Sequence, residues 1–177
     1  MMISTKNTPI FPGTFDPVTR GHCDIIARGA HLFGGLTVAV LTNAAKQPCF
    51  PLKERMAMLQ EALEEAGLAQ TVTVAAYDGL LAEFAHQHRA PCLLRGLRTT
   101  QDYSYEAALA QAHHQLSGTA QLETVFLNAN PALAAVSSSM VRHAAVAGYA
   151  SQFNDQVLDA WVTPAVKLRL RQKFMEG

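Results

Sequence analysis

The sequence predicts an α/β protein built on a five-stranded parallel sheet with helices on both faces. Short apolar runs alternate with longer segments of helical periodicity, a pattern typical of parallel sheets. The run Leu36–Leu41 is almost wholly apolar, as expected of a strand that is covered on both faces. The length of 177 residues is enough for one domain and short for two.

Five apolar runs are the expected strands. The first, Thr8–Phe11, ends at a Pro-Gly pair, and the second is Leu36–Leu41. The other three are Thr71–Tyr77, Pro91–Leu94 and Glu123–Leu127. Ligands of such sheets bind beyond the carboxyl ends of the strands, so the residues just after these runs are candidates for a site.

Helical periodicity fills the gaps between the runs. Apolar residues recur at helical spacing in Leu52–Leu63, and Gly67 follows as a stop. Asp102 or a neighbour is expected to cap a helix that ends near Leu116, and three serines precede another. The expected helices are Gly21–Phe33, Leu52–Leu63, Leu81–Ala85, Asp102–Leu116, one from Met140, and the basic amphipathic tail Val162–Phe174.

The composition limits the class of protein. Apolar residues make up 49% and charged residues 16%, which excludes a disordered chain. The net charge of zero argues against binding of nucleic acid or anionic membrane over the whole surface, although a local basic cleft stays open. Three cysteines without metal-site spacing, and a start without signal-peptide character, favour a cytoplasmic protein. No stretch is expected to span a bilayer.

The string PGTFDPVTRGH, from Pro12 to His22, follows the first strand and opens the first helix. Gly13 allows the backbone to approach a ligand, and Thr14 offers a hydroxyl and a backbone N–H. His22 lies at a helix N-terminus, where free N–H groups favour an anion. The string therefore predicts a phosphate-binding loop in which His22 donates to a phosphoryl oxygen. The alternative is a turn and helix cap with an incidental histidine.

A second cluster, Arg95-Gly96-Leu97-Arg98, follows the fourth run. Two guanidinium forks at this spacing can clamp two phosphate groups. Asp102 and Glu106 follow on a predicted helix, where Glu106 would accept from a sugar hydroxyl or hold an arginine. The alternative is a surface arginine pair that is salt-bridged to these two carboxylates.

Together, the two clusters resemble known nucleotidyltransferases. The GTFDP loop and the signature Thr19-Arg20-Gly21-His22 resemble the adenylyltransferase and cytidylyltransferase superfamily. RGLR followed by Asp-Tyr-x-Tyr-Glu resembles the phosphopantetheine adenylyltransferase family, over about residues 10–146. The resemblance implies one Rossmann-like nucleotidyltransferase domain over 1–177, with a C-terminal helical segment from about residue 150.

The resemblance also implies roles for individual residues. His22, Lys46 and Arg95 match catalytic positions, with His22 stabilising the transition state. Substrate contacts are implied for Thr14, Lys46, Leu81, Arg95, Leu109 and His113. ATP contacts are implied for Thr14, Phe15, His22, Gly96, Leu97, Arg98, Glu106, Leu133, Ala134, Ala135, Val136, Ser137, Ser138 and Ser139. The chain departs from the family where Gln47 replaces a frequent lysine, and where Leu133–Val136 lacks a frequent aromatic residue.

The implied reaction transfers the adenylyl group of ATP to 4′-phosphopantetheine, giving 3′-dephospho-CoA and pyrophosphate by direct in-line attack. Because the attacking group is already an anion, positioning and electrostatic stabilisation supply most of the catalysis. The resemblance further implies Mg²⁺ with the ATP, feedback by coenzyme A and a homohexamer. Two alternatives stay open: a sister enzyme acting on nicotinate mononucleotide or glycerol phosphate, and a non-catalytic nucleotide or coenzyme A sensor.

Overall fold

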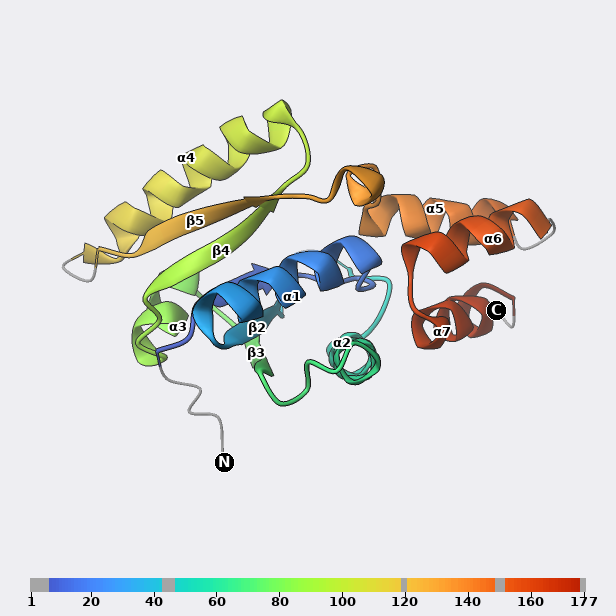
Figure 1. The fold of residues 1–177 in the computed structure, drawn as a ribbon, viewed down its shortest axis with the longest axis horizontal. Coiled ribbons are helices and arrows are strands. Elements are labelled where there is room, and N and C mark those ends of the chain that lie inside the picture. The colour runs from blue at the N-terminus through green and yellow to red at the C-terminus, as the bar shows by residue number, and fades with distance from the viewer. Residues whose placement is uncertain (1–6, 43–46, 119–120, 149–151, 176–177) are drawn as a thin grey trace.

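The computed structural model describes residues 7–42, 47–118, 121–148 and 152–175. Five parallel strands form one sheet in the order β3-β2-β1-β4-β5, which confirms the predicted fold class (Figure 1). The strands are β1 (Ile10–Gly13), β2 (Leu36–Leu41), β3 (Val72–Tyr77), β4 (Cys92–Leu97) and β5 (Glu123–Asn128). The strand order reverses between β1 and β4, and a ligand site is expected at such a reversal.

β4 is longer than the sequence predicted. It continues through Leu97, because Arg95, Gly96 and Leu97 stay in register with β5 as far as Asn128. Arg95 therefore projects from the strand itself and does not lie in a loop after it. A strand holds a side chain more precisely than a loop does.

Seven helices occupy the described ranges, besides one short 3-10 turn at Pro131–Leu133. The cap of α4 is not Asp102 itself but Thr99, three residues before it, whose hydroxyl accepts from the Asp102 N–H. The chain after residue 150 contains two of the helices. The helices are α1 (Arg20–Phe33), α2 (Leu52–Glu65), α3 (Leu81–Gln87), α4 (Thr100–Leu116), α5 (Ser138–Gly148), α6 (Gln152–Trp161) and α7 (Pro164–Met175).

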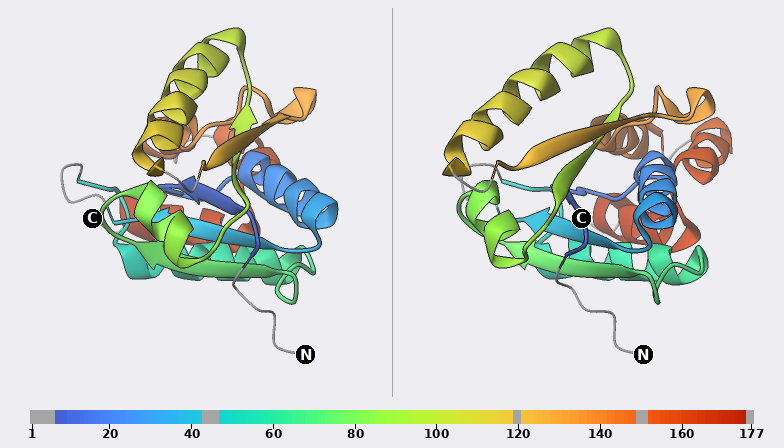
Figure 2. Two further views of the ribbon diagram at one scale, coloured as in Figure 1. Left: turned by 90° about the vertical axis from the view of Figure 1, so that its left-hand side faces the viewer. Right: turned by 60° about the vertical axis from the view of Figure 1, so that its left-hand side comes forward.

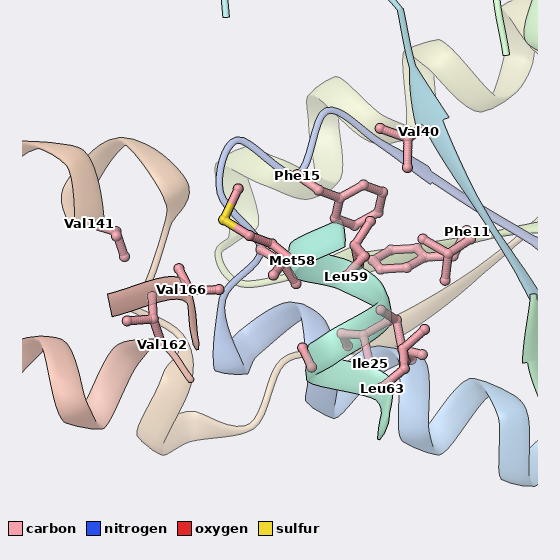
Figure 3. Close-up of a cluster of buried hydrophobic side chains, with 14 of the residues drawn as sticks. Phe11, Phe15, Ile25, Val40, Met58, Leu59, Leu63, Val141, Val162 and Val166 are labelled. Atoms are coloured by element: carbon pink, nitrogen blue, oxygen red, sulfur yellow. The ribbon is translucent and has the colours of Figure 1, made fainter. Parts of the chain in front are cut away.

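Two apolar layers cover the two faces of the sheet, as predicted. Successive strand residues point to opposite faces, so Phe11 and Val38 join one layer while Ile10 and Ala39 join the other. The larger layer packs α1, α2 and the C-terminal helices against the sheet (Figure 3). The smaller one packs α3 against it through Leu81, Phe84 and Ala85.

The two halves of the sheet meet at a narrow seam. β1 pairs with β2 along its whole length, from Ile10 to Gly13, whereas it pairs with β4 where Ile10 lies opposite Leu93. Beyond that point β4 and β5 diverge from β1, as Figure 2 shows. The carboxyl ends of β1 and β4 are therefore held apart. Within the described residues, no helix is both long and apolar enough to cross a membrane.

Candidate active site

A cavity of about 640 Å³ opens between the carboxyl ends of β1 and β4. Its volume is in the range of pockets that hold drug-sized ligands or cofactors. The loop after β1, the end of β4, one side of α4 and the start of α5 all line it. Segments that are distant in sequence thus meet at the reversal of strand order.

The loop after β1 has a strained backbone. Phe15 has a φ of 47°, which bulky residues rarely adopt, and its ring is 2% exposed. A Cβ on Gly13 would lie 2.9 Å from that ring. The glycine is therefore required by the packing of Phe15, a reason different from the close ligand approach that the sequence indicated. Packing of Phe15 against Phe11 fixes the path of the loop past Thr14.

His22 is oriented by the N-cap of α1. Thr19 is the cap, and its hydroxyl accepts from the His22 N–H at 3.3 Å. The Thr19 N–H in turn donates to His22 Nδ1 at 3.1 Å. Because Nδ1 accepts this bond, Nε2 carries the proton of the neutral ring and is its hydrogen-bond donor. Burial, followed by the charges of Arg98 and Arg95, lowers the pKa of His22 to about 4.

Both arginines of the RGLR segment line the cavity, and both are paired with carboxylates. Arg95 binds Glu106 through two hydrogen bonds of 2.6 and 2.5 Å and also donates to the Pro12 carbonyl at 2.9 Å. Arg98 binds Asp102 at 3.0 Å. The salt bridges of the alternative hypothesis are thus present. They are compatible with ligand binding, because these guanidinium groups remain in the wall of the cavity.

The start of α5 is tied to the loop after β1. The Ser138 hydroxyl donates to the Pro17 carbonyl at 2.8 Å, and Arg142 donates to the Asp16 carbonyl. Ser137, Ser138 and Ser139 line the cavity. The N-termini of α1 and α5 therefore both border the cavity, and each favours an anion.

Two buried polar atoms lie in the part of the wall formed by α4 and β5. His113 Nδ1 and Thr124 Oγ1 have no hydrogen-bond partner among the residues that the structure describes. Both residues line the cavity. Burial, followed by the charge of Arg95, lowers the pKa of His113 below its usual value. A buried polar atom without a partner is costly, and a polar ligand group would satisfy it.

Most of the predicted site residues lie in the wall of this cavity. Leu97, Ala134 and Ala135 do not. Leu133 and Val136, which a turn bond from the Val136 N–H to the Leu133 carbonyl at 2.9 Å connects, line the cavity, whereas the two alanines between them do not. Lys46 is outside the described residues. The predicted residues in the wall are Thr14, Phe15, His22, Leu81, Arg95, Gly96, Arg98, Glu106, Leu109, His113, Leu133, Val136 and Ser137–Ser139.

Comparison with known proteins assigns the family. A family model described as cytidylyltransferase-like matches residues 10–144. A phosphopantetheine adenylyltransferase of Thermobifida fusca (strain YX) is 44% identical over 167 residues, which cover 94% of each chain. The chain belongs to the phosphopantetheine adenylyltransferase family. A phosphopantetheine adenylyltransferase of Actinobacillus pleuropneumoniae serotype 3 (strain JL03) is 47% identical over 76% of this chain and 82% of that protein.

Solved structures agree with this family's fold. The structure of Plasmodium falciparum nicotinic acid mononucleotide adenylyltransferase complexed with NaAD has a TM-score of 0.68 and covers 96% of each chain. Its sequence is 15% identical, so this similarity concerns the fold alone.

The sequence did not reveal that three polar residues hold this site together. Asp16 was noted as part of the loop, yet it is buried and accepts from the N–H groups of Cys49 and Phe50, both at 2.8 Å. Arg55 and Arg142 bind carbonyls of the same loop. A signal for Arg55 existed, because it shares the apolar face of its helix with Leu52 and Leu59 at spacings of three and four.

Proposed function

We propose that the protein transfers the adenylyl group of ATP to 4′-phosphopantetheine, giving 3′-dephospho-CoA and pyrophosphate. The observation that carries this is the convergence of two helix N-termini and two arginines on one cavity, in a chain of this family. Positive groups from separate segments are what the joining of two polyanions requires. The relatives' name supplies the acceptor.

His22 is the proposed catalytic group. Its Nε2–H is a neutral donor that is held in one orientation by Thr19. Such a donor stabilises the negative charge that develops on the α-phosphate during in-line attack. Arg95, together with Lys46, is proposed to neutralise the reacting phosphates. The serines at the start of α5 and Arg98 are proposed to bind the phosphates of ATP.

The acceptor arm is proposed to lie along α4. Leu81, Leu109 and His113 line that part of the cavity. An arm that combines amide groups with apolar carbons suits this wall, because His113 Nδ1 and Thr124 Oγ1 are buried and need partners.

Mg²⁺ is proposed to enter with ATP. Within the described ranges, no group of three His, Cys, Asp or Glu side chains is placed to hold a metal ion. ATP phosphate oxygens and water suffice for this ion, which usually keeps several waters. A homohexamer, feedback by coenzyme A and a cytoplasmic location are further proposals from the family resemblance. Sedimentation of the purified protein tests the first, since a monomer would refute it.

A pyrophosphate-release assay tests the proposed function. The pure protein is given ATP or CTP with 4′-phosphopantetheine, nicotinate mononucleotide or glycerol phosphate. We expect release with ATP and 4′-phosphopantetheine. Release with another acceptor, and none with this one, would favour a sister enzyme. Tight binding of ATP without release for any acceptor would favour a nucleotide sensor.

A further inference from the structure

Arg55 is a buried charged residue outside the wall of the cavity. It lies on α2 and is 3% exposed. Its guanidinium donates to three main-chain carbonyls: Thr14 at 2.6 Å, Leu41 at 3.0 Å and Phe50 at 3.1 Å. Burial of a charge is costly unless the charge is paired and hydrogen-bonded, so this placement needs a reason beyond packing.

These three carbonyls belong to three separate segments. Thr14 lies in the loop after β1, Leu41 ends β2, and Phe50 precedes α2. Asp16 also binds the segment that precedes α2, because its carboxylate accepts from the Phe50 N–H at 2.8 Å. Burial lowers the pKa of Arg55, and the nearby Asp16 carboxylate opposes that change. The charge is thus supported by Asp16 and by three carbonyl dipoles.

We propose that Arg55 is a positioning residue that sets the place of Thr14 in the cavity. This inference rests on the proposed function and on the contacts with ATP and the acceptor that the family resemblance implies for Thr14. The fork of a guanidinium reaches several carbonyls at once, whereas a lysine ammonium on a flexible stem has no fixed geometry. Loss of the fork therefore releases the Thr14 backbone from β2 and α2.

The test compares changes at two positions of the same helix, Arg55 and Glu61. Arg55→Lys keeps the charge and loses the fork, and Arg55→Met serves as a second, uncharged variant. Glu61→Gln is the matched control, because it breaks the α2–α7 ion pair with Arg169 at a distance from the cavity. Melting temperature, kcat and both KM values are measured with ATP and 4′-phosphopantetheine.

We expect Arg55→Lys to lower kcat by about 10-fold to 100-fold, since a displacement of about 1 Å near the reacting groups costs that much. KM is expected to change less than kcat. Glu61→Gln is expected to lower the melting temperature and leave kcat unchanged. A kcat of Arg55→Lys that matches the control would overturn the inference, whether or not Arg55→Met folds.

A double variant separates positioning from general damage. If Arg55 acts through Thr14, Arg55→Lys slows the Thr14→Ala enzyme much less than it slows the wild type. If the reduction of kcat in the double variant instead equals the product of the reductions in the two single variants, to within about twofold, the inference is wrong. Absence of turnover in the wild type would overturn the proposed function and this inference with it, whereas an active wild type with unaffected Arg55→Lys would overturn the inference alone.

Discussion

The two sides of the active-site seam differ in how tightly they are packed. On one side, β1 and β2 are almost entirely buried between helices, and the larger apolar layer includes fully buried Met58 and Leu59 (Figure 3). On the other side, α4 has 17 residues and none of them is buried. Tyr105 and Leu116 of that helix are 66% and 60% exposed.

The cavity takes its groups from both sides. Thr14 and His22 come from the densely packed side, whose backbone is fixed by Phe15, Asp16 and Arg55. Arg98, Glu106 and His113 come from the loosely packed side. Catalysis requires its groups to be placed to within about 0.5 Å. Binding of a flexible acceptor arm, in contrast, tolerates a cavity wall that changes its shape. We infer that the dense side holds His22 in place for the reaction, and that α4 adjusts to the acceptor.

The largest expected difference is in stability. Leu59→Ala removes a fully buried side chain and is expected to lower the free energy of unfolding by about 2–5 kcal/mol. Leu116→Ala is expected to change it by no more than about 0.5 kcal/mol. Urea unfolding of both variants measures this. If Leu116→Ala lowered the free energy of unfolding as much as Leu59→Ala does, the two sides would not differ in packing. That result would show that α4 is covered in an assembly.

The next largest effect concerns the reaction rate. His22→Ala removes the fixed donor and is expected to lower kcat by about 100-fold to 1000-fold while the fold is retained. His31→Ala is the matched control, because His31 is exposed at the other end of the same helix. Steady-state pyrophosphate release measures both. A His22→Ala enzyme with near-normal kcat would remove His22 from its catalytic role.

The fold was largely predictable because its signals are local. Leu36–Leu41 was predicted to the residue, since a short apolar run that follows a glycine and precedes polar residues favours a buried strand. The end of β4 was not, because Arg95 and Gly96 are polar or small, and only their pairing with Phe126 and Leu127 of β5 keeps them in the strand. Pairing between distant segments overrides local preference there.

The sequence predicted most of the residues that line the cavity, but not the residues that hold them in place. The loop string and the RGLR segment identified the groups that line the cavity. Spacing places Arg55 on the apolar face of its helix, but no spacing pattern indicates which main-chain groups of other segments Asp16 and Arg55 bind. Nor could spacing decide between phosphate clamp and salt bridge for Arg95, which is paired with Glu106 while lining the cavity.

A third prediction concerns the α4 side. Arg95→Ala leaves Glu106 as an unpaired negative charge beside the phosphate site. We expect a loss of about 2 kcal/mol, or about 30-fold in kcat/KM for 4′-phosphopantetheine. Adding Glu106→Gln removes that repulsion and is expected to restore part of the loss. Lys53→Ala, an exposed change on α2, controls for loss of positive charge. A double variant slower than Arg95→Ala would show that Glu106 has its own role with the ligand.

The smallest expected effect is a pH dependence of protein stability, which comes from His22 on the dense side. The pKa of His22 is about 4 in the folded protein, below its usual value of 6.5. The unfolded chain therefore binds a proton at this residue as the pH falls below about 6.5, while the folded protein does not until near pH 4. Stability from His22 is present above pH 6.5 and is lost progressively toward pH 4. Between pH 7.5 and 5.5 the loss is about 1 kcal/mol.

His22→Gln isolates that contribution. Glutamine does not titrate, so urea unfolding of the ligand-free variant should depend less on pH over this interval than that of the wild type. His113 on α4 also has a lowered pKa, and it remains in both proteins, so the difference between the two curves belongs to His22. Parallel curves would mean that the pKa of His22 stays near 6.5 in the folded protein, and that burial does not keep its ring neutral below that pH.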